Sequence, residues 1–346
     1  MEKQGQHTYE EITHQKAAWQ QALDVVTRQV DTFRGLLSIA PGEAIFTGCG
    51  STYYLAQSGA ALFQELTGRT ARAFPASELL INPKVVFNRN SEAQKVLFAI
   101  SRSGTTSETI KTVEEFKRQG LGKIVAVTNY TETPLAALAD MAFVIPNGQE
   151  QSVAQTRSFS SMYVCMSALC LVAADLDAKL LSMAVLPETS VILLSKAEQV
   201  VRPIGEDLSL ERFYFLGNGP RYGLASEVSL KMKEMTLSHS EPFHFLEFRH
   251  GPISMVNEHT LIVALLSQNG YELERQVLDD VRKLGGRVFT VAESDADIAF
   301  HSGLDEETRN VLYLPAIQLM AYYRSLAKGL NPDRPHNLES VVKLAL

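Results

Sequence analysis

Hydroxyl side chains are concentrated in a short segment that directly follows the apolar run 96–100. Six of the seven residues in the segment 101–107 are Ser, Thr or Gly, and a helix-like pattern over 108–119 follows. This order predicts a buried strand that enters a helix through a small-residue turn. Free backbone N–H groups and the positive end of the helix dipole meet at such a turn, which therefore favours an anion.

The same turn offers hydroxyl groups that can donate hydrogen bonds to phosphate oxygens, namely those of Ser101, Ser103, Thr105 and Thr106. No Lys follows Gly104 as it does in a nucleotide P-loop, so we expect the phosphate of a small molecule rather than ATP. The alternative is a simple Ser/Thr N-cap on an ordinary helix.

A second cluster carries acid–base side chains. Glu227, Lys231 and Glu234 are spaced i, i+4, i+7 and share one face of a predicted helix. A carboxylate held near a Lys on a partly buried face can act as a base with a controlled pKa, although a solvated Glu–Lys ladder has the same spacing. Further acidic and imidazole groups follow within sixteen residues and favour a site: His239, Glu241, His244, Glu247 and His250.

Metal and redox cofactors are not predicted. Glu247 and His250 have the i, i+3 spacing that can ligate iron or zinc, but a single pair lacks the further ligands that a metal site needs. Neither Gly-x-Gly turn of the chain completes a dinucleotide fingerprint with a well-placed acid. Gly251-Pro252 ends the helical pattern, which leaves His250 at a helix end or on a loop.

The elements that must position these groups occur twice. FTGCGSTYYLA (46–56) matches FLGNGPRYGLA (215–225) at an offset of 169 residues, and AISRSGTTSE (99–108) matches LLSQNGYELE (265–274). The fold class predicted is therefore α/β, with two tandem domains that each contain a mostly parallel, doubly wound sheet in three αβα layers. The second copy has lost most of the hydroxyls, so we expect only the first sheet to bind phosphate.

The predicted domain limits follow from this repeat. They are an N-terminal helical segment over 1–40, a first domain over 41–190 that binds phosphate, a second domain over 191–330 that carries the Glu and His residues, and an extended tail over 331–346. The boundary region is placed near 185–200, where a long helical stretch (156–183) gives way around Pro187. The helix-like stretch 9–34 is expected to pack across the body or a partner subunit.

Bulk composition excludes several classes of protein. The 346 residues carry a net charge of −7 without a basic tract, so no nucleic-acid partner is expected. No apolar run reaches membrane length and the first residues are unlike a signal peptide, so no membrane partner is expected. The three cysteines, Cys49, Cys165 and Cys170, indicate reduced thiols and a cytoplasmic location.

Several ordered motifs together resemble the sugar isomerase (SIS) domain family, and within it the isomerase half of the glutamine–fructose-6-phosphate aminotransferases. The resemblance covers nearly the whole chain and is carried by GCGSTYYLA (48–56), SRSGTTSET (101–109), GQEQSVAQTRSF (148–159), EVSLKMKEMTLSHSE (227–241), EFRHGP (247–252) and NPDRPHNL (331–338).

The resemblance implies a role for each matching residue. It places the sugar phosphate on Ser51, Thr52, Ser101, Ser103, Thr106 and the backbone of Arg102. It places the rest of the substrate beside Gly50, Val153, Ala154 and Gln155. Glu234 matches the base that moves a proton between C1 and C2, with Lys231 beside it. His250 matches the residue that opens the sugar ring, in the site of the neighbouring subunit. The family therefore implies a homodimer with shared active sites and no cofactor.

Three departures from the aminotransferases narrow the expected activity. The glutaminase domain is absent, Gln155 replaces a serine, and only Lys343 is available to replace the lysine of the C-terminal tail. These features resemble stand-alone family members, which include glucosamine-6-phosphate deaminases, fructosamine-6-phosphate deglycases and ketose/aldose isomerases. We therefore expect an enzyme that acts on a 6-phosphorylated amino sugar or fructosamine. The alternatives are isomerisation without loss of nitrogen, and a non-catalytic phosphosugar sensor.

Overall fold

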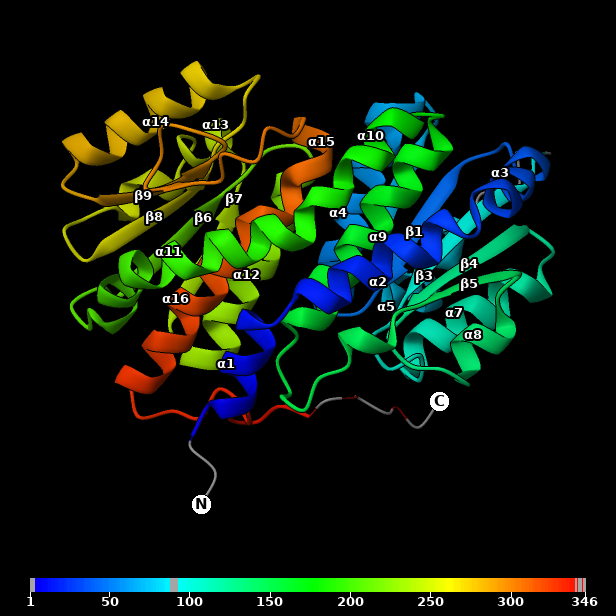
Figure 1. The fold of residues 1–346 in the computed structure, drawn as a ribbon, viewed down its shortest axis with the longest axis horizontal. Coiled ribbons are helices and arrows are strands. Elements are labelled where there is room, and N and C mark those ends of the chain that lie inside the picture. The colour runs from blue at the N-terminus through cyan, green and yellow to red at the C-terminus, as the bar shows by residue number, and fades with distance from the viewer. Residues whose placement is uncertain (1–3, 88–92, 340, 342–343, 345–346) are drawn as a thin grey trace. The chain divides into compact units, whose positions relative to one another are not determined.

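Two compact units make up the chain, and each is built on one parallel sheet (Figure 1). The computed structural model describes residues 4–87, 93–339, 341 and 344. The N-terminal sheet unit comprises Gln15–Gln149, Arg157–Ala184 and Glu339–Leu346. The C-terminal sheet unit comprises Met1–His14, Glu150–Thr156 and Val185–Leu338. Both units thus differ from the predicted contiguous domains, because residues 1–14 and 150–156 group with the second sheet.

The sheet of the N-terminal unit has five strands in the order β2-β1-β3-β4-β5, and every pair is parallel. The chain alternates strands with helices as the repeat predicts. The elements are β1 (Ala44–Gly48), α4 (Ser51–Thr67), β2 (Ala71–Pro75), α5 (Ala76–Ile81), α6 (Pro83–Val86), β3 (Lys95–Ile100), α7 (Ser107–Arg118), β4 (Gly122–Thr128), α8 (Pro134–Leu138), β5 (Met141–Val144) and η1 (Pro146–Gly148).

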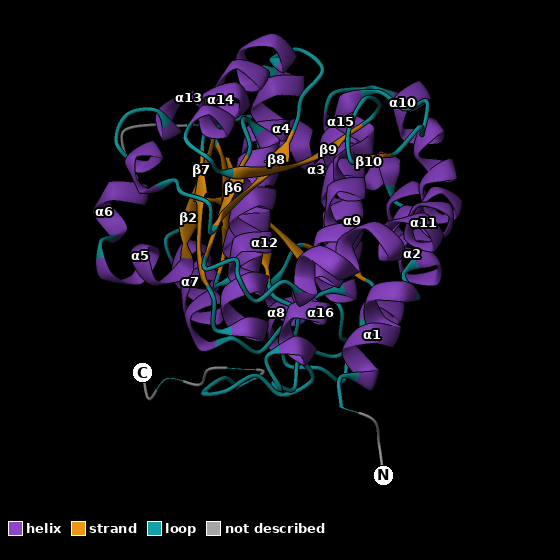
Figure 2. Cartoon of the chain, turned by 90° about the vertical axis from the view of Figure 1, so that its left-hand side faces the viewer, coloured by secondary structure: helices purple, strands orange, loops and turns teal. Residues whose placement is uncertain are grey.

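The central strands β1 and β3 are buried on both faces, which explains their mostly apolar sequences, AIFTG and KVLFAI. Successive side chains point to opposite faces. Leu97 and Ala99 pack in a core with α7 residues such as Phe116. Phe46 and Phe98 form the other core, with their rings stacked 4.4 Å apart. Figure 2 shows strands with helices on either side, as expected for three αβα layers.

Further helices of this unit cover the aromatic face, namely α2 (Lys16–Thr27), α3 (Val30–Ile39), α9 (Arg157–Ala173) and α10 (Asp177–Ser182). Trp19 on α2 is fully buried and its indole N–H donates to Ser160 Oγ on α9 over 3.0 Å. The predicted single helical stretch 9–34 is wrong in detail. It is divided among α1 (Gln6–Thr13), α2 and α3, with breaks at residues 14–15 and 28–29.

The sheet of the C-terminal unit repeats the same topology. Its order is β10-β9-β8-β6-β7, again entirely parallel. After η2 (Met183–Val185), the elements are α11 (Leu186–Glu206), β6 (Arg212–Leu216), α12 (Pro220–Thr236), β7 (His239–Phe243), α13 (Phe245–Phe248), η3 (Pro252–Met255), β8 (Thr260–Leu265), α14 (Tyr271–Lys283), β9 (Arg287–Ala292), β10 (Ile298–Ala299), α15 (Glu306–Arg309), η4 (Asn310–Tyr313) and α16 (Leu314–Ala327).

The second sheet also has two covered faces. On one face, Tyr214 and Ile262 pack with Phe248 of α13 and Val277 of α14. On the other face, α12 contacts β6 and packs on α16, which in turn packs on α11. The two predicted tandem doubly wound sheets are therefore confirmed.

The sequence predicts that the helical stretch 156–183 gives way around Pro187, but the chain is helical at Pro187 itself. Pro187 occupies the first turn of α11, where a missing N–H costs no hydrogen bond. The helical run Asp177–Glu206 is the single described segment whose length and composition would permit a membrane span, despite its charged Glu188 and Lys196. Core helices of water-soluble proteins meet the same criterion, so this is weak support for a span.

Candidate functional site

Two turns meet at the carboxyl end of the first sheet. β1 and β3 are neighbours, with Thr47 paired to Ala99, yet their following helices α4 and α7 lie on opposite faces of the sheet. The strand order therefore reverses between β1 and β3. Ligands of doubly wound proteins bind at such switch points. The turns 48–52 and 101–106, both predicted to bind phosphate, are thus brought together within one unit.

The first turn depends on glycine for its shape. Gly50 has φ +56, and a Cβ at Gly48 would lie 2.6 Å from the backbone carbon of Thr52. Thr52 Oγ1 accepts from the N–H of Cys49 and donates to its carbonyl oxygen, both over 2.9 Å. Ser51 and Thr52 are buried at the first positions of α4.

Hydroxyl groups brace the second turn from within. Ser101 Oγ accepts from the N–H of Gly104 over 3.1 Å and lies 3.0 Å from Thr106 Oγ1. Ser103 Oγ accepts from the backbone N–H and the hydroxyl of Thr105. The carbonyl oxygen of Arg102 accepts from β4, which fixes the peptide that follows it. The turn is therefore preorganised.

The N-terminus of α7 remains suited to an anion. Thr106 is its N-cap residue but forms no side-chain cap hydrogen bond. The first N–H that bonds back to the Thr106 carbonyl belongs to Ile110, so the N–H groups before it lie outside the helical ladder. The hydroxyls and these amides form a cradle at the positive end of the helix dipole.

Cys49 connects the two turns, with its Sγ 3.6 Å from Thr109 Oγ1 of α7. Burial raises the pKa of the Cys49 thiol to about 11, so the thiol stays protonated at neutral pH and is a poor nucleophile. All three cysteines are free, as predicted. From the C-terminal tail, the N–H of Leu344 donates to Ser107 Oγ over 3.2 Å. Lys343, which the sequence analysis considered for the tail lysine, lies outside the described residues.

The corresponding place in the second sheet is filled by the protein itself. Glu274 on α14 is buried, and its carboxylate accepts from the N–H and hydroxyl of Ser267 at 2.7 and 2.9 Å. It also accepts from the Asn218 side chain at 3.1 Å, in the turn that follows β6. The Glu274 carboxylate thus takes up three donors of these two turns, and the expectation that this sheet only supports the site stays a prediction.

The acid–base residues of α12 form a buried ion-paired triad. Lys231 Nζ lies 2.5 Å from Glu234 Oε2 and 3.4 Å from Glu227 Oε1. Lys231 and Glu227 are buried, whereas the Glu234 side chain keeps 19% of its accessible surface. The spacing prediction is confirmed for Lys231 and Glu234. Sequence reasoning placed Glu227 on this face without giving it a role, and the structure makes it the second counter-charge.

The ammonium at the centre of this triad stays charged. Burial alone would lower the pKa of Lys231, but the carboxylates of Glu227 and Glu234 outweigh that effect, and the pKa is raised. Lys231 is therefore a fixed positive charge and not a base at neutral pH. Glu234 is the more exposed of the two carboxylate partners of Lys231, with 19% of the side-chain surface accessible.

The remaining predicted residues lie elsewhere in the C-terminal unit. His250 follows α13 in a turn before Gly251, and its side chain is exposed. His244 stacks on Tyr222 with ring centres 4.0 Å apart, and burial lowers its pKa. Val153, Ala154 and Gln155 lie in the segment 150–156. Because Glu234 and the phosphate cradle belong to different units, their meeting in one site stays a prediction.

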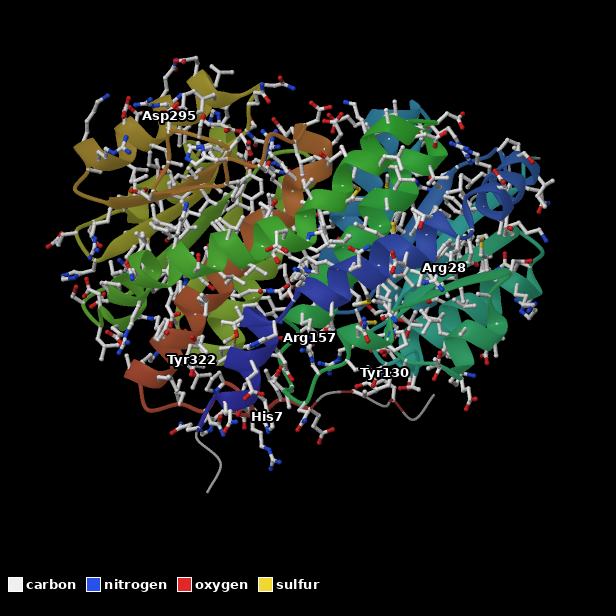
Figure 3. The ribbon with its side chains drawn as sticks, viewed as in Figure 1. His7, Arg28, Tyr130, Arg157, Asp295 and Tyr322 are labelled. Carbon is white, nitrogen blue, oxygen red and sulfur yellow. The ribbon has the colours of Figure 1, made fainter. Side chains whose placement is uncertain are left out.

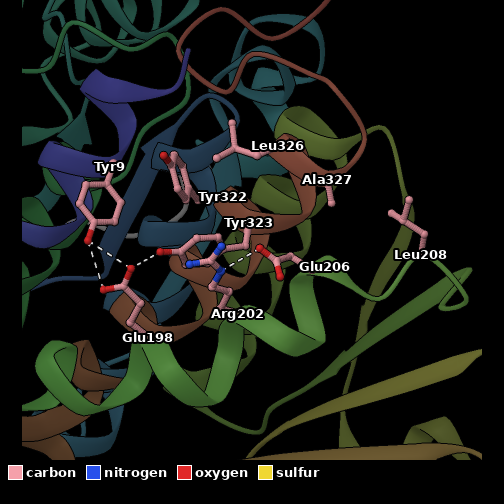
Figure 4. A pocket seen from close by; sticks show the side chains of 9 residues that line it. All are labelled: Tyr9, Glu198, Arg202, Glu206, Leu208, Tyr322, Tyr323, Leu326 and Ala327. Atoms are coloured by element: carbon pink, nitrogen blue, oxygen red, sulfur yellow. Dashed lines mark hydrogen bonds and ion pairs between the residues drawn. The ribbon is translucent and has the colours of Figure 1, made fainter. Parts of the chain in front are cut away.

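A pocket of about 730 Å³ in the C-terminal unit was not expected from the sequence (Figure 4). Its polar groups are paired with one another. The Glu198 carboxylate accepts from the phenol groups of Tyr9 and Tyr323, and Arg202 bonds Glu206 over 2.8 Å. None of the predicted site residues lines it. Within the described part of the chain, no group of three or more potential metal ligands occurs.

Two doubly wound sheets, the first with hydroxyl-bearing turns at its switch point, define the general class of this protein. The SIS domain family model matches residues 39–172 and 209–316, so the chain belongs to the SIS domain family. This finding confirms the resemblance drawn from the motifs.

Curated relatives carry longer chains. A glutamine–fructose-6-phosphate aminotransferase (isomerizing) from Sulfurisphaera tokodaii is 29% identical over 341 residues, which cover 96% of this chain and 55% of that protein. The corresponding protein of Sulfolobus acidocaldarius is 31% identical over 310 residues, which cover 87% of this chain and 50% of that protein. The chain thus spans about half the length of these relatives.

Solved structures match from end to end. Glucosamine-6-phosphate deaminase from Thermotoga maritima superposes with a TM-score of 0.81 at 26% identity, covering 98% of this chain and 100% of that one. Tagatose-6-phosphate ketose/aldose isomerase from Escherichia coli gives a TM-score of 0.83 at 23% identity, covering 96% of each chain. At that identity the second match shows the shared fold alone.

Proposed function

We propose that this chain is an enzyme that removes nitrogen from a 6-phosphorylated amino sugar or fructosamine. The observation that carries the proposal is the α12 triad, in which a buried ammonium holds the partly exposed carboxylate of Glu234. A non-catalytic sensor needs only the phosphate site and has no use for a base held in this way. The end-to-end likeness to a glucosamine-6-phosphate deaminase supports the same class of substrate.

The reaction divides between the two sets of residues. The turns at 48–52 and 101–106, together with the α7 N-terminus, bind the phosphate and so fix the distance from C6 to the reacting carbons. His250 transfers a proton as the sugar ring opens. Val153, Ala154 and Gln155 border C1. Lys231 holds the side chain of Glu234 in place through their ion pair, and Glu234 acts as the base.

For glucosamine 6-phosphate, Glu234 takes the proton from C2 of the open-chain aldehyde, which gives an enolamine. Return of the proton to C1 leaves an imine at C2. Water adds to this imine and ammonia leaves, so that the products are fructose 6-phosphate and ammonia. For a fructosamine 6-phosphate the proton moves from C1 to C2, and hydrolysis of the imine at C1 releases the amine. Neither sequence requires a redox cofactor.

The test is turnover of glucosamine 6-phosphate and of fructosamine 6-phosphates, with coupled detection of ammonia or amine. We expect Glu234→Gln to lower kcat about 10²–10⁴-fold, the usual effect of losing a general base. Glu272→Gln, which changes an exposed carboxylate on α14, is the control and should retain activity. An unchanged rate in Glu234→Gln would remove this residue from the mechanism. Sugar interconversion without ammonia would indicate an isomerase, and binding without turnover a sensor.

A further inference from the structure

The segment 150–156, called here the C1 loop, is held from α1 by a single carboxylate. Glu11 is 3% exposed, and its Oε1 accepts from the N–H of Gln151 over 2.6 Å and from the N–H of Ser152 over 3.3 Å. Its Oε2 accepts from the hydroxyl of Ser152. Three donors of the loop therefore converge on one side chain about 140 residues away in the sequence.

A second connection runs through the segment that follows α16. Asp333 Oδ1 accepts from the N–H and the hydroxyl of Thr8 at 2.8 and 2.7 Å. The carbonyl oxygen of Asp333 accepts from the N–H of Val153 over 3.0 Å. Thr8 and Glu11 lie one turn apart on α1. Glu11 binds the amides of Gln151 and Ser152 directly, and Thr8 holds Asp333, whose carbonyl binds the amide of Val153.

The ends of the loop are also fixed by hydrogen bonds. Glu150 Oε1 accepts from the N–H and hydroxyl of Thr156 at 2.7 and 2.8 Å, and the Thr156 carbonyl accepts from Gln318 of α16. Gln155 differs from its neighbours, because its buried Oε1 accepts no hydrogen bond from the described residues. That oxygen is an acceptor ready for a donor of the substrate.

The helix that holds the loop is itself anchored on its other side. Tyr9 of α1 donates to Glu198 of α11, and its ring lies 5.4 Å from that of Tyr322 on α16 (Figure 4). Figure 3 shows Tyr322 on α16 next to α1. α1 is thus a rigid connection between the α11–α16 pair and the C1 loop.

Resting on the proposed function, we infer that Glu11 is a positioning residue that sets the conformation of the C1 loop and hence the placement of C1 and C2 over Glu234. A mere packing role would be served by an apolar or amide side chain. Burial and the nearby Glu150 instead raise the pKa of Glu11, so a carboxylate here opposes folding at neutral pH.

The experiment compares Glu11→Ala and Glu11→Gln with Glu10→Gln, an exposed neighbour on α1. In Glu11→Ala we expect the amides of Gln151 and Ser152 to exchange hydrogen at least about 10-fold faster, since they lose their acceptor. We expect kcat on the amino-sugar phosphate to fall about 10–100-fold, because small misplacements of reacting atoms are costly. Affinity for inorganic phosphate, bound by the other unit, should not change. Glu11→Gln keeps one acceptor oxygen, so its exchange rates and its kcat should lie between those of the wild type and Glu11→Ala. Glu10→Gln should match the wild type in both measurements.

These measurements distinguish a failure of the role inferred for Glu11 from a failure of the proposed function. Unchanged exchange at Gln151 and Ser152 in a folded Glu11→Ala protein would overturn the role inferred for Glu11. So would faster exchange with an unchanged kcat, since the loop would then not position the substrate. If Glu11→Ala does not fold, amide exchange and kcat are measured on the milder variant Glu11→Gln, and the same criteria apply. A wild-type protein that turns over no candidate sugar refutes the proposed function and with it the catalytic role of Glu11, while exchange still reports whether Glu11 holds the loop.

Discussion

Lys231 is the residue whose environment says most about the chemistry. A fully buried ammonium is rarely tolerated without counter-charges, and here it has two of them on one helix face. The arrangement places a charged ammonium beside Glu234. No group of three or more potential metal ligands occurs among the described residues. The arrangement also makes the stability of α12 depend on charge balance, because Glu227 is as buried as Lys231.

The charge balance between Lys231 and Glu227 can be tested by substitution. Lys231→Met should destabilise the protein by about 3–5 kcal/mol, because it leaves the buried Glu227 carboxylate without its counter-charge. The double variant Lys231→Met, Glu227→Gln should recover most of this loss. Denaturant unfolding of both variants measures the difference. Equal stability of the single and double variants would show that the ion pair does not govern α12.

At the scale of elements, a strand, a turn and a helix N-terminus recur four times, twice in each sheet. The same backbone arrangement carries different side-chain interactions in the two sheets. In the first sheet the turns display hydroxyls around an uncapped helix start, and in the second sheet Glu274 closes the equivalent turns with three hydrogen bonds. Position 274 matches position 108 in the internal repeat, so a carboxylate stands at the same place in both copies.

We predict that Glu274→Ala weakens folding by about 3 kcal/mol. The change leaves the buried amide and hydroxyl of Ser267 and the Asn218 amide without their acceptor, and each unpaired buried donor costs about 1–3 kcal/mol. Glu272→Ala, an exposed change on the same helix, should alter stability by less than about 0.5 kcal/mol. Thermal or denaturant unfolding compares the two. Similar stabilities would mean that solvent replaces the carboxylate freely.

The sequence was most informative about candidate functional residues that lie close to one another in the chain. Spacing alone placed Lys231 with Glu234, and the run of small residues after β3 identified the turn at Ser101–Thr106. It could not reveal Glu11 or Asp333, whose partners lie 140 or more residues away, since no local pattern encodes such contacts. Glu274 resembled one more charge on an amphipathic helix, and its match to Glu108 in the repeat did not distinguish the two copies.

At the scale of the whole molecule, the exposed His250 is the residue that motivates a homodimer. We propose that it completes the site of a partner subunit, and the prediction is tested by complementation. Glu234→Gln and His250→Ala should each be inactive alone. Mixed after reversible dissociation, they should recover roughly one quarter of wild-type activity, because half of the dimers contain one intact site. No recovery in confirmed mixed dimers would place both residues in the same subunit's site.

The hydrogen bonds of the Glu274 carboxylate predict how many molecules of ligand one polypeptide binds. Two sheets of equivalent strand order would be expected to accept two equivalents of a phosphorylated sugar. In the second sheet, however, donors of both turns already bond the Glu274 carboxylate, whereas the buried Oε2 of Glu108 at the matching position accepts no hydrogen bond from the described residues. Titration calorimetry should therefore give a stoichiometry of one per polypeptide, with no second, weaker event as the concentration rises.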